Sequence, residues 1–226
     1  MNAVDVAPTR LERAKQKVRD LIALRAGART ALIAYSGDAH VVLPFTDDAK
    51  IITTYVDALA SELMPVAGRK PSAALAAAES LLASEPTPGS ILFITDDIPG
   101  TEQPAFVAHA KASENGVLAL AVGTAQGGPL RAGPGRYAQS AAGEKVIARL
   151  DMPRLEALAE AAGATLVPAT LDRSDVERIQ RGVQSRLEQV IEQSARTRWR
   201  DAGYWLTWPL LLLIALSFRR GWTMRW

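Results

Sequence analysis

Short runs of consecutive apolar residues are the feature that most constrains this fold. The clearest run is ILFIT, Ile91–Thr95, which leads directly into Asp96 and Asp97. A strand that is apolar on both faces is typical of a parallel sheet with helices covering each side. The run therefore predicts a buried strand that delivers acidic side chains to the edge of a sheet. Those carboxylates are candidates for metal ligands, for catalytic groups, or for the remainder of a site that no longer works.

Segments with helical spacing of apolar residues alternate with the apolar runs. Two of them begin with the capping-box pattern, Thr9 with Glu12 and Ser174 with Glu177. This alternation predicts an α/β fold with a largely parallel sheet. The predicted helices cover residues 9–25, 47–59, 71–82, 102–114, 153–162 and 174–198, and the predicted strands cover 30–35, 40–43, 91–95, 117–122 and 165–167. In the first helix Lys15, Lys17 and Arg19 lie off the apolar face.

Composition excludes several classes of protein. The chain of 226 residues carries 26 basic and 24 acidic side chains, a net charge of +2 that gives no reason to expect a nucleic-acid partner. It contains no cysteine, which rules out disulfides, thiolate nucleophiles and cysteine-ligated metal centres.

The C-terminal segment predicts attachment to a membrane. Residues Tyr204–Phe218 carry no charge, are flanked by aromatic residues and are followed by Arg219 and Arg220. This pattern predicts a single transmembrane helix over 203–220, with a buried core helix or an interfacial anchor as the alternatives. The arginines after the helix favour a cytoplasmic C-terminus, and therefore an extracytoplasmic domain in the cell membrane.

Several segments together resemble a known family. The segments "DVAPTRLERAKQKVRDLIAL", "ALIAYSGDAHVVLPFTDD", "MPVAG", "ILFITDD" and the final Trp- and Leu-rich stretch with "RRGW" resemble the von Willebrand factor type A (VWA) domain, in its bacterial membrane-anchored, aerotolerance-operon (Bat-like) form. The resemblance implies a doubly wound, Rossmann-like sheet that binds partner proteins, often through Mg²⁺. It also implies envelope assembly or stress tolerance as the role, with other VWA membrane proteins and a MoxR-type ATPase as partners.

The family's metal-site motifs are incompletely matched. The first, Asp-x-Ser-x-Ser-Met, aligns only by its last residue, with Met1, so the chain as given lacks that motif and the first central strand before it. The second places Thr after a Gly, where this chain has Arg69 after Gly68. The third, Thr-Asp-Gly, is matched by Thr95 and Asp96, and Asp97 replaces the glycine.

These residues define a degenerate binding site in which Asp96 is the one metal ligand that remains. No cofactor is expected for the chain as given, and Mg²⁺ only if an upstream Asp-x-Ser-x-Ser strand exists. Arg69 and Asp96 are instead expected to form an ion pair in place of the cation. The helix that starts close to Met1 favours a true start further upstream.

The expected organisation is a VWA-like domain at 1–170, a long amphipathic helix and juxtamembrane segment at 171–202, the membrane helix, and a tail at 221–226. A non-enzymatic interaction domain is the preferred function. The alternative is a Mg²⁺-dependent phosphoryl-transfer or hydrolytic enzyme that uses Asp96 and Asp97. A membrane-tethered scaffold whose long helix packs on a partner is a third possibility, and His40 and His109 are expected to be structural.

Overall fold

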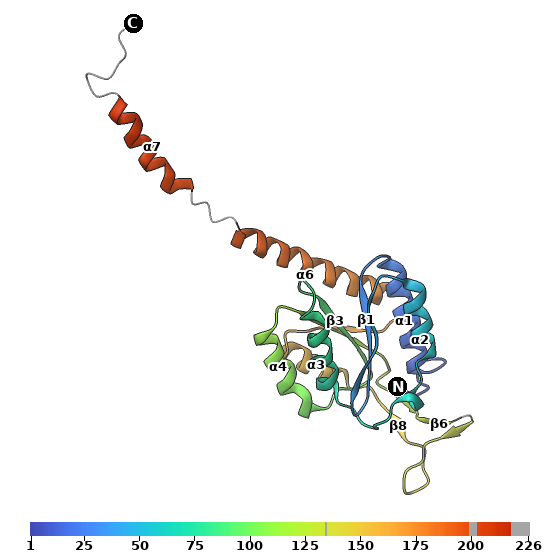
Figure 1. The fold of residues 1–226 in the computed structure, drawn as a ribbon. Helices are drawn as coiled ribbons and strands as arrows, with labels where there is room; N and C mark the ends of the chain where they lie inside the picture. Colours follow the sequence, from blue (N-terminus) through green and yellow to red (C-terminus); the bar gives the residue numbers. More distant parts are fainter. Residues whose placement is uncertain (134, 199–202, 218–226) are drawn as a thin grey trace. The chain divides into compact units, whose positions relative to one another are not determined.

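The computed structural model of the protein describes residues 1–133, 135–198 and 203–217 (Figure 1). The chain divides into two compact units, Met1–Leu187 and Glu188–Trp226. The first unit contains all the strands that the structure describes and forms the α/β domain.

The parallel sheet of the first unit consists of three strands in the order β3-β4-β9, and its two pairings are both parallel. A separate two-stranded antiparallel sheet is formed by β1 and β2. The α/β class with a parallel sheet is therefore confirmed. The bounds are β1 Thr30–Tyr35, β2 Ala39–Thr46, β3 Ser90–Thr95, β4 Gly116–Ala121 and β9 Thr165–Pro168.

Further short strands form an excursion between β4 and the following helix, in the segment where the sequence is rich in glycine. β5 pairs with β8 and β6 pairs with β7, both antiparallel. Their bounds are β5 Gly128–Pro129, β6 Arg131–Gly133, β7 Arg136–Tyr137 and β8 Ile147–Ala148.

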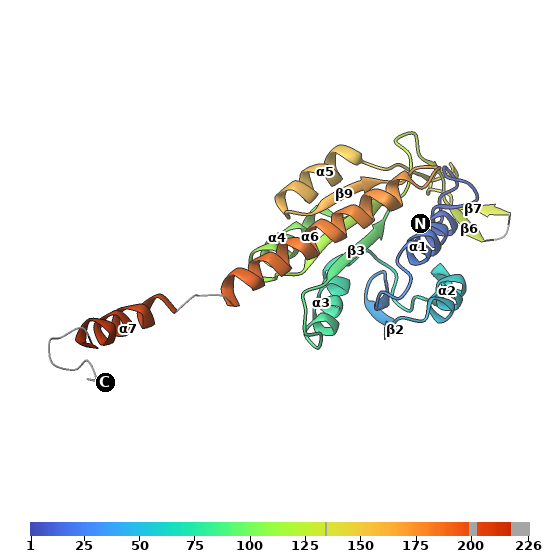
Figure 2. The same ribbon diagram turned by 90° about the horizontal axis from the view of Figure 1, so that it is seen from above.

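Helices cover both faces of the parallel sheet (Figure 2). Their bounds are α1 Arg10–Leu24, α2 Ala49–Ala58, α3 Pro71–Leu82, α4 Gln103–Ala112, α5 Met152–Ala161 and α6 Ser174–Arg198, with short 3-10 helices η1 at Ser61–Leu63 and η2 at Gly100–Glu102. On one face, α3, α4 and α5 pack around Phe93 and Ala119. On the other face, α1 and α6 pack against Leu118 and Leu120.

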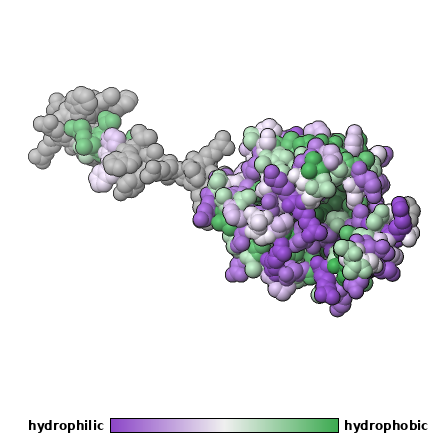
Figure 3. All heavy atoms as spheres, turned by 90° about the horizontal axis from the view of Figure 1, so that it is seen from below, coloured by the Kyte–Doolittle hydropathy of each residue, from purple (hydrophilic) through white to green (hydrophobic). Residues whose placement is uncertain are grey.

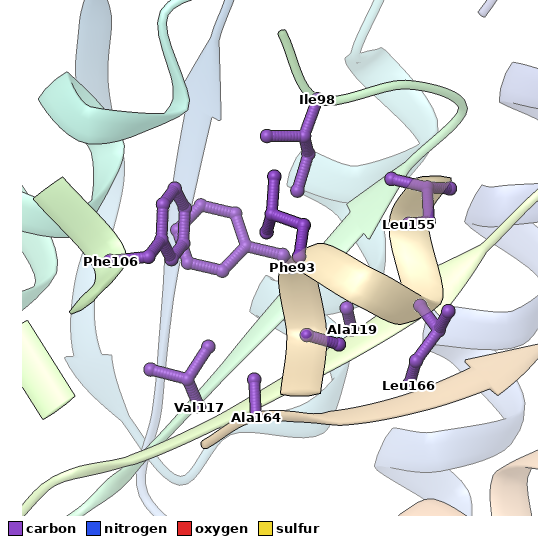
Figure 4. A pocket seen from close by; sticks show the side chains of 10 residues that line it. Phe93, Ile98, Phe106, Val117, Ala119, Leu155, Ala164 and Leu166 are labelled. Carbon is purple, nitrogen blue, oxygen red and sulfur yellow. The ribbon is translucent and has the colours of Figure 1, made fainter. Parts of the chain in front are cut away.

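The core is closely packed where α4 and α5 meet the sheet. A cavity of only about 10 Å³ remains there, lined by Phe93, Phe106, Leu155 and other apolar residues (Figure 4). This volume is at the lower limit for a single water, and an apolar lining of this kind stays dry. The outer surface is largely hydrophilic on the face shown in Figure 3.

Charged residues of α1 lie differently from what the helical pattern suggests. Lys15 and Lys17 are buried, with exposed fractions of 7% and 2%. Lys17 Nζ donates to Asp175 Oδ1 over 2.8 Å, and this ion pair connects α1 to α6. Lysines can lie off the apolar face of a helix and still be buried, because α1 contacts helices on its flanks as well as the sheet.

The start of α6 is also capped differently from the prediction. The side chain of Ser174 donates to Asp172 Oδ1 over 2.8 Å, and Asp172 Oδ1 also accepts from the backbone N–H of Ser174 over 3.2 Å. Asp172 therefore holds this helix end, and the predicted Ser174–Glu177 capping box is wrong. The capping residue Thr9 at the start of α1 is confirmed, since its hydroxyl accepts from the N–H of Glu12 over 3.2 Å.

The second unit contains the C-terminal helix α7, Gly203–Ser217. The predicted membrane helix over 203–220 extends past the part that the structure describes, as does the predicted tail at 221–226. In the described part of the chain, no helix combines the length and the apolar character needed to cross a membrane.

Candidate functional site

The candidate site lies where β3 and β4 end, since the carboxyl ends of parallel strands form one edge of a sheet. Thr95, the last residue of β3, is buried, and the two aspartates follow it. Thr95 Oγ1 donates to the carbonyl of Asp97 over 2.8 Å and accepts from its N–H over 3.2 Å. This local turn directs Asp96 and Asp97 to different partners.

Arg10, the first residue of α1, is the centre of the buried part of the site. Its exposed fraction is 1%, and its guanidinium contacts two carboxylates. Nε and Nη2 each donate to Asp5 over 2.8 Å, which is a bidentate pair, and Nη1 donates to Asp96 Oδ2 over 3.3 Å. Nη2 also donates to the carbonyl of Ala148 over 2.8 Å. Such charge-assisted, bidentate contacts fix the guanidinium in position.

Asp5 completes this network from the N-terminal segment. Its Oδ2 accepts from the backbone N–H of Thr124 over 2.7 Å and from the Thr124 hydroxyl over 3.0 Å. Burial alone raises the pKa of Asp5, but hydrogen bonds from Arg10 and Thr124 favour the carboxylate and lower the pKa from 3.8 to about 2. Asp5 is therefore ionised throughout the physiological range of pH.

Gly123 gives the guanidinium its space. A Cβ atom at this position would lie 2.8 Å from Arg10 Cζ, and the backbone has a φ of +150°. A side chain here, two residues after β4 ends, would therefore have to displace the Arg10 guanidinium group.

Asp96 is buried and its carboxylate is already bound by cations. Besides Arg10, the N-terminal ammonium group of Met1 contacts Oδ2 over 2.6 Å. The expected pairing of Asp96 with Arg69 is wrong, because Arg10 approaches Asp96 from α1 and occupies the position first assigned to Arg69.

Arg69 pairs with Asp97 instead. Its Nη1 donates to Asp97 Oδ2 over 2.5 Å, and Arg154 of α5 lies 3.3 Å from Asp97 Oδ1. Arg154 also donates to the carbonyl of Ile98 over 2.6 Å. Since the Arg69 side chain is 58% exposed and that of Asp97 is 24% exposed, this cluster faces solvent.

Gly68 positions Arg69 by allowing two loops to approach each other. The backbone of Gly68 has a φ of +150°, and a Cβ atom there would lie 2.9 Å from Gly37 Cα. The turn between β1 and β2 also bonds to this loop, with Lys70 N–H donating to the carbonyl of Ser36 over 2.6 Å. The predicted residues Gly68 and Arg69 are thus brought beside Asp97, on the solvent side of the site.

The residues present do not fit a hard divalent cation. Mg²⁺ binds through carboxylates and waters, and it requires oxygen ligands that other cations do not occupy. Arg10 contacts Asp96, and Arg69 and Arg154 contact Asp97. In the described ranges, no group of three or more His, Cys, Asp or Glu side chains is placed to hold a metal ion.

Both histidines contact carboxylates outside the candidate site. His40 of β2 contacts Asp38 over 2.8 Å, and His109 of α4 contacts Glu79 of α3 over 2.5 Å. The Glu79 carboxylate also accepts from Ser113 and Asn115, so this cluster joins α3 to the end of α4. The carboxylates and guanidinium groups of the candidate site, in contrast, form directed ion pairs with each other.

Sequence reasoning missed Arg10, Asp5, Thr124 and Arg154. Arg10 and Asp96 are 86 positions apart, and no local pattern connects them. The one available signal is the pair of opposite charges in "DVAPTR", directly before the first predicted helix.

Comparison with known proteins agrees with this fold. Residues 1–99 match the family model of the von Willebrand factor type A domain. The comparison with curated proteins gives no match. Among solved structures, the conserved hypothetical protein BatB from Bacteroides thetaiotaomicron is 24% identical, with a TM-score of 0.75 over 83% of this chain and 93% of that chain.

Two further structures share the fold. An aerotolerance-related membrane protein from Bacteroides fragilis is 23% identical, with a TM-score of 0.71 over 84% of this chain and 93% of that one. The VWA domain of SpRpn10 is 14% identical, with a TM-score of 0.51 over 78% of this chain and 86% of that one. Residues 1–99 thus resemble a von Willebrand factor type A domain, and the chain shares its fold with these solved structures beyond that range.

Proposed function

We propose that this protein is a membrane-associated VWA domain that binds partner proteins through the carboxyl edge of its sheet without a metal ion. The observation that carries the proposal is the exposed cluster of Arg69, Asp97 and Arg154 beside the buried Arg10–Asp96 pair. Arginines hold the carboxylates in fixed directions, which is the task of the cation in metal-dependent members of the family. Charged groups arranged in this way select a complementary partner surface.

Binding rather than catalysis is the role that these contacts support. A general acid or base needs a proton that it can exchange with a substrate, whereas Asp96 and Asp97 are each engaged by arginine. The Mg²⁺-dependent enzyme would first have to displace those arginines. We therefore prefer the non-enzymatic function.

We propose envelope assembly or stress tolerance as the setting, with other VWA membrane proteins and a MoxR-type ATPase as partners. The support is the resemblance of the sequence and the shared fold with a protein described as aerotolerance-related. Membrane association is supported by α7, whose residues Trp208, Leu210, Leu211 and Leu212 are each more than half exposed. We place the domain on the extracytoplasmic side, because arginines follow this helix in the sequence.

The test is a binding measurement with a MoxR-type ATPase and with other VWA membrane proteins from the same organism. Arg69→Glu should weaken the affinity about tenfold or more, equal to about 1.4 kcal/mol. Arg29→Glu is a matched control, because Arg29 is also 58% exposed and pairs with Glu85 over 2.6 Å, before β1 and β3 begin. Equal affinities for the two variants would contradict a role for this edge, and binding that requires added Mg²⁺ would contradict the metal-independent form.

A further inference from the structure

The excursion between β4 and α5, residues 124–150, projects from the domain beside the N-terminus and α1 (Figures 1 and 2). It contains the pairs of β5 with β8 and of β6 with β7, and the N–H of Val146 donates to the carbonyl of Ala138 over 2.9 Å between them. The excursion lies next to the candidate site, since Arg10 Nη2 donates to the carbonyl of Ala148 over 2.8 Å. The charged network of the site therefore also holds the base of the excursion.

Further contacts fix the excursion against the N-terminal segment. The N–H of Thr124 donates to Asp5 Oδ2 over 2.7 Å, and the N–H of Arg131 donates to the carbonyl of Asn2 over 3.0 Å. The two segments approach closely at Gly128, where a Cβ atom would lie 2.5 Å from the backbone nitrogen of Asp5. The excursion is thus held beside the carboxyl edge of the sheet by backbone contacts at its start and along its length.

The excursion carries an excess of positive charge. Residues 124–150 contain four basic side chains and one acidic side chain, Glu144, which is a net charge of +3, whereas the whole chain has +2. The four basic side chains are all exposed, and they are Arg131, Arg136, Lys145 and Arg149. Within the ranges that the structure describes, none of them pairs with a carboxylate, in contrast to Arg69 and Arg154, which both pair with Asp97. The domain therefore leaves this positive charge uncompensated.

Apolar side chains lie among these cations. Tyr137, Val146 and Ile147 are large hydrophobic residues that are exposed. The ammonium group of Lys145 lies 4.9 Å from the ring centre of Tyr137, which is a cation–π contact. Tyrosine and arginine are enriched at protein interfaces and contribute much of their binding energy. An exposed aromatic ring among unpaired arginines is therefore a suitable surface for a partner protein.

We propose that the excursion binds an acidic segment of a partner protein, whose carboxylates pair with the exposed arginines and whose apolar side chains pack on Tyr137 and Ile147. Arginine binds a carboxylate through two parallel N–H donors, which adds direction to the attraction. Complementary charge also increases the rate at which the partner associates. A protein is favoured over a lipid surface because the excursion is held beside the candidate protein-binding edge, so that one partner can contact both.

Binding at the excursion rests on the proposed function, since both place the partner at the carboxyl edge, and it adds the charge of the partner and a second contact surface. The test is the binding of a short fluorescein-labelled peptide in which glutamate alternates with leucine, measured by fluorescence anisotropy with the full chain in a nonionic detergent. The double variant Arg131→Glu and Arg136→Glu should bind this peptide about tenfold or more weakly than the unchanged protein. Higher ionic strength should also weaken binding to the unchanged protein.

The matched control is the double variant Arg178→Glu and Arg181→Glu on α6. Both side chains are exposed, and this variant changes the net charge of the protein by the same amount. It should keep the affinity of the unchanged protein, because the reversed charges lie outside the excursion. A peptide with glutamine in place of glutamate is the second control, and it should bind about tenfold or more weakly because it lacks the carboxylates.

Three results would overturn the proposal. The first is the same affinity of the two double variants for the glutamate peptide, or no binding of that peptide at all. The second is equal affinity for the glutamate and glutamine peptides. The third is displacement of the peptide by phosphatidylglycerol, but not by phosphatidylcholine, added to the detergent micelles, which would assign the surface to anionic lipid.

Arg69→Glu in the same assay separates the excursion from the charged cluster of the proposed function. Weaker binding by the excursion variant alone would support the excursion and leave the cluster without a role in binding this peptide. Weaker binding by Arg69→Glu alone would overturn the proposal for the excursion and support the cluster. Weaker binding by both variants is the result expected for one acidic partner that contacts both surfaces.

Discussion

At the scale of single residues, Arg10 is the side chain that the carboxyl edge depends on most. It is almost fully buried and binds two carboxylates that come from different parts of the chain. Removing one member of a buried ion pair leaves the other charge without compensation, which is more costly than losing a surface pair.

Arg10→Met should therefore lower the free energy of unfolding by about 3–5 kcal/mol, because Asp5 and Asp96 lose their common partner. Urea denaturation measures this change. Arg19→Met on the same helix is the control, since Arg19 and Asp57 form an exposed pair, and it should cost about 1 kcal/mol or less. A similar small cost for Arg10→Met would show that Arg10 does not organise the site.

The shifted pKa of Asp5 makes a second prediction at this scale. Because hydrogen bonds from Arg10 and Thr124 outweigh the effect of burial, the folded-state pKa is about 2, against an ordinary value of 3.8. A lowered pKa adds stability that is fully present above the ordinary value and is lost as pH falls through the folded-state value. The domain should therefore lose this stability between pH 3.8 and about pH 2.

An NMR titration of the Asp5 carboxyl group tests this directly. The Asp5→Asn variant should lose less stability than the unchanged protein between pH 3.8 and about pH 2. A pKa of Asp5 near 3.8 in the folded protein would mean that hydrogen bonds from Arg10 and Thr124 do not stabilise its carboxylate.

At the scale of elements, the sequence predicts most of the fold. β3 and β4 are apolar at nearly every position, and α1 and α3 start at Thr9-Arg10 and Pro71, where cap residues indicate a helix start. The site is less predictable. Thr95 and Asp96 could be located from the end of a strand, but the choice of Arg10 over Arg69 as the partner of Asp96 depends on how α1 packs, which local patterns do not contain.

Another contact of this kind joins two helices. Lys17 of α1 and Asp175 of α6 pair over 2.8 Å with side chains that are 2% and 0% exposed. Lys17→Met should lower the free energy of unfolding by about 3–5 kcal/mol, because Asp175 remains buried without its cation.

The matched control is Lys15→Met, two positions away on α1. Lys15 is also buried, but its partner Glu12 is 45% exposed and stays solvated when the lysine is removed, so this variant should cost less than Lys17→Met. Denaturation curves that coincide for the two variants would contradict a role for the Lys17–Asp175 pair in holding α6.

At the scale of the whole molecule, the proposed membrane association rests on α7. The double variant Leu211→Arg and Leu212→Arg should move the protein from the membrane fraction to the soluble fraction, because each arginine costs about 2.5–3.5 kcal/mol in an apolar environment of lipid. Leu171→Arg, at a loop position that is 84% exposed, is the control and should stay with the membranes. Membrane attachment that survives the double variant would assign the anchor to another segment.

We propose that arginines, and not a metal ion, organise the carboxyl edge of the sheet. Thermal unfolding of the purified protein with and without 10 mM Mg²⁺ tests this proposal. The midpoint of unfolding should be the same in both conditions. A bound ion at about 100 times its Kd would add about 2.7 kcal/mol of stability, which raises the midpoint by several degrees in a domain of this size. An increase of that size, absent from an Asp96→Asn variant, would show that Mg²⁺ displaces Arg10 from Asp96 and that the edge binds a metal ion after all.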